Sequence, residues 1–264
     1  MELATLEWGP AEGLPFIALH GWLDNAGTFS RLAPLLSGLR VVAVDLPGHG
    51  RSPHREQYYF VDGVVDTVRQ ADRLGWERFS LLGHSMGAGV APLVAGTLPE
   101  RVERLVLIEG LGPLTSQAED APAQLARALA FEARPPAIYS SYEQAVERIA
   151  STRGGLSRES AEFLAERVVV SVPGGFSFGH DPRLRAPSRL RLTEPEVLAF
   201  FRRVSCPTLV IEAENGMRFN EDVVEGRLKA LRGPVELVRL AGGHHLHLED
   251  PEPVAAEIRR FLGV

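Results

Sequence analysis

The sequence has little of several features that mark particular classes of protein. Cys206 is the only cysteine among 264 residues, so no disulfide can form within the chain and a reducing, cytoplasmic setting is expected. No apolar run reaches the roughly 20 residues that a transmembrane helix needs. The first residues also lack a charged flank followed by a long apolar segment, which is the pattern of a secretory signal. These absences predict a soluble intracellular protein without a membrane partner.

Basic residues are scattered, and no block of them occurs anywhere in the chain. The 28 Lys and Arg residues are outnumbered by 34 Asp and Glu residues, which gives a net charge of −6. This balance offers no electrostatic footprint for nucleic acid or for an anionic membrane surface. A small uncharged molecule is the expected partner, and the sequence leaves the oligomeric state open.

Short apolar runs bounded by turn residues recur along the chain, and most are nearly continuous rather than alternating. This pattern is typical of strands buried on both faces of a parallel sheet. Helical periodicity separates the runs, notably over residues 61–74 and 254–262. Strand and helix alternate, so we predict one α/β domain with a mostly parallel sheet flanked by helices. The predicted strands are Phe16–Leu19, Val41–Asp45, Phe79–Leu82, Leu105–Ile108, Leu209–Ile211 and Val235–Leu240.

The alternation stops between Gly112 and Pro195, where Ala, Arg and Glu dominate. We predict a helical insertion at residues 112–195, between a first core segment at 1–111 and a second at 196–264. Pro173–Gly175 should turn the chain back, and the β-branched residues of Val168–Val172 leave a strand open as an alternative. The predicted helices of the insertion are 121–133, 142–151 and 157–169.

The strongest signal for chemistry is Gly83-His84-Ser85-Met86-Gly87, a G-x-S-x-G pattern between a predicted strand and a small-residue helix. Such a turn is so tight that side chains flanking the serine must be nearly absent, which explains the two glycines. It presents the hydroxyl of Ser85 at the carboxyl edge of the sheet, where open α/β folds place their sites. Ser85 is therefore predicted to be a nucleophile.

A serine hydroxyl reacts only when a neighbouring base can take its proton. His244 follows Gly242-Gly243 at the end of the last predicted strand, so it lies on a loop at the same edge of the sheet. His245 and His247 compete by position, but only His244 directly follows the glycine that lets this loop bend. His244 is the predicted general base.

Acyl transfer also needs backbone N–H groups that hold the developing oxyanion. One is expected from Met86, the residue after the nucleophile. The second is expected from Trp22, in the run His20-Gly21-Trp22-Leu23-Asp24-Asn25 that follows the first predicted strand. His20, Gly21 and His84 flank these donors and are the predicted substrate-binding residues.

These motifs and their order resemble the α/β-hydrolase family. The resemblance rests on the turn at 83–87, His20-Gly21-Trp22, the run Asp45-Leu46-Pro47-Gly48-His49-Gly50-Arg51-Ser52, and Gly243-His244 with Glu249 and Pro251. It covers residues 14–112 and 204–262, and the run at 20–25 is similar to the serine hydrolase-like branch. The resemblance implies that the insertion is a helical cap over the site. Its apolar residues would then line an acyl pocket, among them Phe131, Ile138, Tyr139, Tyr142, Phe163, Phe176 and Phe178.

The chain departs from the family at the acidic residue of the catalytic triad, which in this family consists of a nucleophile, a histidine and a carboxylic acid. The family usually carries an aspartate where this sequence has Gly216, within Ala213-Glu214-Asn215-Gly216. Some relatives instead supply the acid from the end of the preceding strand, which is the place of Glu109. Glu109 is therefore the predicted acid, Glu214 is its main rival, and Glu212 is disfavoured because it should still belong to the strand.

Together these residues predict a serine hydrolase that cleaves a carboxylic ester or a related acyl compound through an acyl-enzyme. The chemistry requires no metal or organic cofactor. A carbon–carbon bond hydrolase or a perhydrolase would use the same serine and stays open. The missing aspartate at position 216 also leaves open a non-catalytic binding protein on a hydrolase scaffold.

Overall fold

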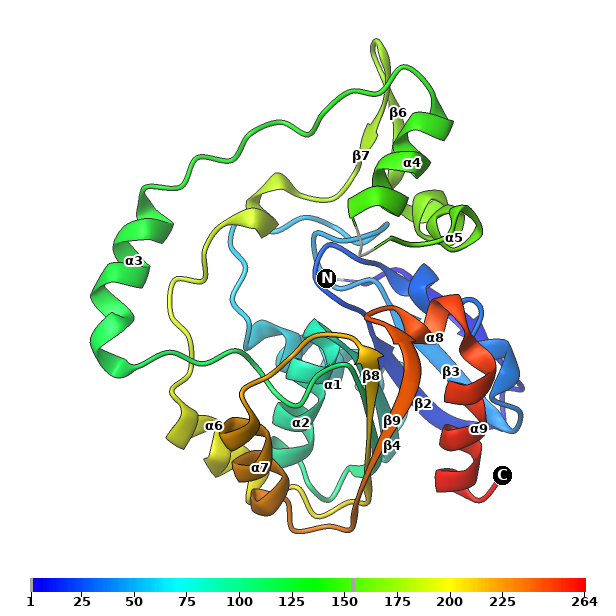
Figure 1. The fold of residues 1–264 in the computed structure, drawn as a ribbon, viewed down its shortest axis with the longest axis vertical. Coiled ribbons are helices and arrows are strands. Elements are labelled where there is room, and N and C mark those ends of the chain that lie inside the picture. The colour runs from blue at the N-terminus through cyan, green and yellow to red at the C-terminus, as the bar shows by residue number, and fades with distance from the viewer. Residues whose placement is uncertain (1, 153–154) are drawn as a thin grey trace.

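A seven-stranded sheet forms the centre of the protein (Figure 1). The structure is a computed structural model that describes residues 2–152 and 155–264. The strand order is β1-β3-β2-β4-β5-β8-β9, with β1 antiparallel to β3 and the other pairings parallel. The strands are β1 (Thr5–Trp8), β2 (Leu14–Leu19), β3 (Leu39–Val44), β4 (Phe79–His84), β5 (Val102–Ile108), β8 (Thr208–Asn215) and β9 (Val235–Gly243). All six predicted strands and the predicted fold class are confirmed, whereas β1 was not predicted.

Both faces of this sheet are apolar, which explains the continuous runs in the sequence. In β2, Ile17 and Leu19 point into one core, and Phe16 and Ala18 point into the other. Helices α1, α2 and α6 cover the first face, while η1, η2 and α9 cover the second. The helices around the sheet are η1 (Ala26–Phe29), η2 (Ala33–Leu35), α1 (Asp62–Arg73), α2 (Met86–Thr97), α6 (Glu194–Phe201), α7 (Glu221–Ala230), α8 (Leu246–Glu249) and α9 (Pro251–Leu262).

The insertion combines helices with a β-hairpin. Its predicted helices appear as α3 (Ala121–Leu129), α4 (Tyr142–Thr152) and α5 (Arg158–Val168), with short turns η3 (Ala118–Asp120) and η4 (Pro182–Arg185). The insertion is helical except for this hairpin, in which β6 (Val169–Val172) pairs with β7 (Gly175–Phe178) through a turn at Pro173 and Gly174. The strand alternative for residues 168–172 is the correct one. The predicted boundary at 195 falls inside α6, which packs on α2 and belongs to the core.

The insertion is attached to the carboxyl edge of the sheet by buried polar contacts. Nε and Nη2 of Arg167, in α5, donate to Oδ2 of Asp45 at 3.1 and 2.5 Å, and both side chains are buried. Asn25 Nδ2 donates to the carbonyl of Leu164 at 2.9 Å. In Figure 1, α4, α5 and the hairpin consequently lie over one end of the sheet, while α3 stands apart at the side.

None of the helices in the described ranges is long and apolar enough to cross a lipid bilayer.

Candidate active site

Four strand ends deliver the candidate residues to one edge of the sheet. His20 follows β2, Ser85 follows β4, Glu109 follows β5 and His244 follows β9. These strands run parallel, so their carboxyl ends meet at the same edge. The strand order also reverses between β2 and β4, since β3 lies beyond β2 and the later strands lie beyond β4. Such a reversal opens the crevice in which α/β sheets bind ligands.

Ser85 occupies a strained turn between β4 and α2. Its backbone has φ 51° and ψ −110°, a conformation that non-glycine residues rarely adopt. A Cβ on Gly83 would lie 2.5 Å from the carbonyl oxygen of Gly87, and a Cβ on Gly87 would lie 2.0 Å from that of Leu19. The two glycines are thus required by close backbone packing, and Ser85 stands partly exposed at the tip of the turn.

His244 lies directly after β9 on a loop that depends on glycine. Gly242 has φ 123°, in the region that favours glycine, so Gly242 provides the bend that was expected from its neighbour. The carbonyl oxygen of His244 accepts a hydrogen bond from Nε2 of His84 at 2.9 Å. The loop of His244 is thereby tied to the residue that precedes Ser85.

The carboxylate of Glu109 contacts the imidazole of His244. Oε2 of Glu109 lies 3.1 Å from Nδ1 of His244, and the Glu109 side chain is only 1% exposed. Two backbone N–H groups hold this carboxylate: Ala213 donates to Oε1 at 2.6 Å and Met217 donates to Oε2 at 2.8 Å. Glu109 also has a positive φ of 54°, which turns its side chain out of the strand direction. Glu214, the rival acid, is exposed to solvent.

Gly216 leaves the space that the Glu109 carboxylate fills. A Cβ at position 216 would stand 2.0 Å from Oε2 and 2.4 Å from Cδ of Glu109. The absence of an aspartate at this position is therefore compensated by a carboxylate that arrives from β5. The structure places Glu109 against His244, and Ser85 follows His84, whose ring bonds the carbonyl of His244.

The two expected oxyanion donors belong to α2 and to the loop after β2, which approaches Ser85: a Cβ on Gly21 would lie 3.3 Å from Cβ of Ser85. Met86 is the first residue of α2, and the leading N–H groups of a helix have no acceptor within it. Trp22 lies in a tight turn before Leu23, which has φ 57°. The Trp22 ring is 53% exposed, and its Nε1 donates to the carbonyl of Leu184 in the insertion at 3.0 Å.

His20 and His84 have no accessible ring surface, so the expectation that they contact the substrate is replaced by a structural role. Nδ1 of His20 donates to the carbonyl of Gly21 at 2.7 Å, and its Nε2 accepts from the N–H of Leu46 at 3.0 Å. This ring therefore fixes the loop that carries Trp22. His84 holds the His244 loop in the same way.

Four histidine rings gather behind the serine. The ring of His84 lies 4.1–5.0 Å from those of His244, His245 and His247, measured between centroids. Burial and these neighbouring rings hold the pKa of His84 well below 6.5. Burial likewise lowers the pKa of His247 to about 3. His84 and His247 are therefore neutral at physiological pH, and they pack beside the site as uncharged polar groups.

From the sequence, His245 was only a competitor of His244 and Asp24 had no assigned role, but the structure places both residues in this cluster. Oδ2 of Asp24 lies 3.5 Å from Nε2 of His245 and 3.9 Å from Nδ1 of His84. The available signal was weak, since both lie beside stronger motif residues and read as loop packing.

The single thiol offers no rival nucleophile, because burial raises the pKa of Cys206 to about 11.

Comparison with known proteins identifies the family of this chain. The sequence model of the α/β-hydrolase family matches residues 16–257. A serine hydrolase-like protein of Danio rerio is 34% identical over 99% of this chain and 85% of its own. The crystal structure of a hypothetical protein from Pseudomonas aeruginosa is 49% identical, with a TM-score of 0.90 over 98% of this chain and 94% of that one. A thioesterase domain from the curacin biosynthetic pathway is 26% identical, with a TM-score of 0.86 over 98% and 99%. The chain is thus a hydrolase that belongs to the α/β-hydrolase family, in its serine hydrolase-like branch.

Proposed function

We propose that the protein cleaves a carboxylic ester or a related acyl compound through an acyl-enzyme on Ser85. The observation that carries this proposal is the contact of 3.1 Å between Nδ1 of His244 and Oε2 of Glu109. A carboxylate at Nδ1 fixes the imidazole tautomer that leaves Nε2 able to accept a proton. The strained turn at Ser85 lies at the same sheet edge, so base and nucleophile come from adjoining loops.

The reaction then follows from these groups. Oγ of Ser85 attacks the acyl carbon while His244 takes its proton, and Glu109 stabilises the imidazolium. The N–H groups of Trp22 and Met86 hold the oxyanion of the tetrahedral intermediate. Collapse breaks the bond to the leaving group, which takes the proton from His244. Water then attacks the acyl-enzyme with His244 again as base, and the free acid leaves Ser85 restored.

The acyl group should lie against the insertion. An open cavity of about 460 Å³ lies between the end of α3 and η4, lined by Ala130, Phe131, Glu132, Arg134, Pro182 and Arg185. Leu184, within η4, accepts the hydrogen bond of Trp22 Nε1, so η4 connects this cavity to the proposed oxyanion loop, which contributes no residue to the lining. Its mixed apolar and charged lining suits an acyl chain with a polar end.

The experiment is a panel of nitrophenyl esters of graded acyl length, assayed with the native protein, Ser85→Ala and Ser205→Ala. Ser205 is exposed and precedes β8, at the opposite edge of the sheet, so it is the matched control. Ser85→Ala should reduce kcat by about 10⁶-fold, and Ser205→Ala should leave it unchanged. Equal hydrolysis by all three proteins would contradict the role of Ser85, and absence of hydrolysis by the native protein across the panel would favour a binding protein on this scaffold.

A further inference from the structure

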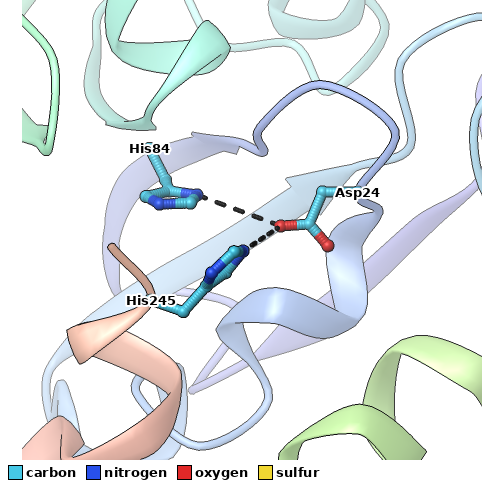
Figure 2. A group of neighbouring side chains, drawn as sticks. All are labelled: Asp24, His84 and His245. Atoms are coloured by element: carbon cyan, nitrogen blue, oxygen red, sulfur yellow. Dashed lines mark ion pairs between the residues drawn. The ribbon is translucent and has the colours of Figure 1, made fainter. Parts of the chain in front are cut away.

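Three buried side chains from separate segments of the chain converge behind the active site (Figure 2). Asp24 comes from the loop after β2, His84 ends β4, and His245 lies between β9 and α8. Their potential ligand atoms are Oδ2 of Asp24, Nδ1 of His84 and Nε2 of His245, and all three lie within 4.8 Å of one another. The proposed reaction uses none of these atoms.

The hydrogen bond made by Nε2 of His84 determines whether Nδ1 of the same ring carries a proton. A carbonyl oxygen only accepts, so Nε2 of His84 must donate to the carbonyl of His244. In the neutral ring, Nδ1 then carries a lone pair. This atom is fully buried, and within residues 2–152 and 155–264 it has no hydrogen-bond partner. It faces Oδ2 of Asp24 at 3.9 Å, so two electron-pair donors point at each other.

Asp24 is held in the orientation that creates this arrangement. Its Oδ1 accepts a hydrogen bond from the N–H of Asn25 at 3.0 Å. Its Oδ2 is thereby directed at both histidines, and Figure 2 shows the two contacts meeting at this one oxygen. Buried lone pairs that converge in this way are stabilised by a cation between them.

We propose that Asp24, His84 and His245 bind one divalent transition-metal ion of the zinc type. Imidazole nitrogens favour zinc, copper and nickel, whereas magnesium and calcium prefer oxygen ligands. A tetrahedral zinc ion with ligands at about 2.0–2.1 Å needs ligand atoms about 3.4 Å apart. The separations of 3.5 and 3.9 Å from Oδ2 of Asp24 are close to this value. The two histidine nitrogens lie within 4.8 Å of each other, so binding requires a contraction of no more than about 1.4 Å between them.

The contraction would act on the proposed base. Nε2 of His84 bonds the carbonyl of His244, and His245 is its neighbour in the chain. An ion that draws His84 and His245 towards Asp24 therefore moves the backbone of His244, and a displacement near 1 Å costs about 10²-fold in rate. The bound metal is thus an inhibitor and not a catalytic cofactor. This second step rests on the proposed catalytic role of His244, whereas metal binding does not.

Calorimetric titration of the metal-free protein with zinc chloride tests the binding. One ion should bind per chain, and magnesium chloride should give no heat of binding. Asp24→Asn and His245→Gln should each weaken zinc binding by about ten-fold or more. His54→Gln is the matched control, because His54 is an exposed histidine whose ring nitrogens face the carbonyl of Gly179 and the carboxylate of Asp181. Absence of zinc binding by the native protein would overturn the proposal, as would an equal loss in His54→Gln.

His244 and Glu109 are the alternative place for the ion. Zinc binding should persist in His244→Gln, and its loss there would place the ion at the base and contradict the proposed site. X-ray absorption of the zinc-loaded native protein gives a readout that does not depend on whether a variant folds. It should show two imidazole nitrogens at about 2.0–2.1 Å, and a single imidazole would contradict the site.

Inhibition is measured with an ester that the native protein hydrolyses. Zinc at saturation should lower kcat by about ten-fold or more, and EDTA should restore it. Zinc binding without inhibition would contradict the proposed inhibition, while the proposed metal site would stand. Absence of ester hydrolysis would count against the proposed function, and calorimetry would still decide the metal site.

Discussion

Replacing Gly216 by Ala should disable the site by moving the Glu109 carboxylate, without altering any group proposed to act in the reaction. The added methyl group would lie 2.0 Å from Oε2 of Glu109 and 2.4 Å from its Cδ. Non-bonded heavy atoms need about 3.5 Å, so the carboxylate has to move by more than about 1 Å. Gly216 is not among the glycines with positive φ, so alanine can adopt its backbone conformation and the displacement falls on Glu109.

A displacement of this size costs about 10²-fold in rate, or about 2.7 kcal/mol. Complete neutralisation of a triad acid costs about 10⁴-fold, which sets the upper limit. We therefore expect Gly216→Ala to lower kcat for a nitrophenyl ester by 10²- to 10⁴-fold with little change in KM. Gly226→Ala is the control, because a Cβ there meets nothing within 4 Å. A folded Gly216→Ala variant with native kcat would refute the assignment of Glu109 as the acid.

The same geometry predicts a rescue. A side chain at position 216 starts 2.4 Å from the place of the Glu109 Cδ, so an aspartate there puts a carboxylate beside His244. Glu109→Ala combined with Gly216→Asp should hydrolyse the ester at least about ten-fold faster than Glu109→Ala alone. Equal rates for the double and single variants would mean that the site needs the carboxylate to arrive from β5.

The other predictions concern the acid, the insertion and the pocket. Glu109→Gln should lower kcat by about 10³- to 10⁴-fold, whereas Glu214→Gln should have little effect. A large loss in Glu214→Gln and a small one in Glu109→Gln would instead make Glu214 the acid. Arg167→Ala leaves a buried carboxylate without its partner and should lower the free energy of unfolding in urea by about 3–5 kcal/mol. Arg158→Ala, which breaks an exposed pair, should cost no more than about 1 kcal/mol, and equal losses would contradict this. Phe131→Ala should shift the preferred acyl length in the ester panel, while the reaction of Ser85 with a fluorophosphonate stays unchanged. An unchanged acyl preference would place the pocket elsewhere.

The sheet was predictable because its strands are buried on both faces, and such strands read as continuous apolar runs. The strands that were missed are partly exposed and short. Thr5–Trp8 lies at the sheet edge, and Gly175–Phe178 belongs to a hairpin outside the main core. Helix α1 was located correctly, but Val61 and Val65 of its expected apolar stripe are each 46% exposed. Tertiary packing decides which face of a helix is buried, and the periodicity of apolar residues alone could not predict that face.

The site was predictable as far as it follows from strand order. Ser85, Glu109 and His244 each follow a parallel strand, so the topology itself brings them to one edge. The cluster of Asp24 and His245 depends instead on how two loops fold against each other. No spacing in the sequence encodes that contact, because the two residues are joined only in space.

The most direct test of the central claim is reaction of the native protein with a fluorophosphonate, followed by peptide mapping of the adduct. A serine that is activated by a neighbouring base attacks phosphorus and retains the phosphonate, whereas an ordinary serine hydroxyl does not react. We expect one phosphonate per chain on Ser85, and no labelling of the Ser85→Ala protein. Labelling at another residue would contradict the assignment of Ser85 as the nucleophile. A Ser85→Ala protein that hydrolyses the ester as fast as the native protein would contradict it too.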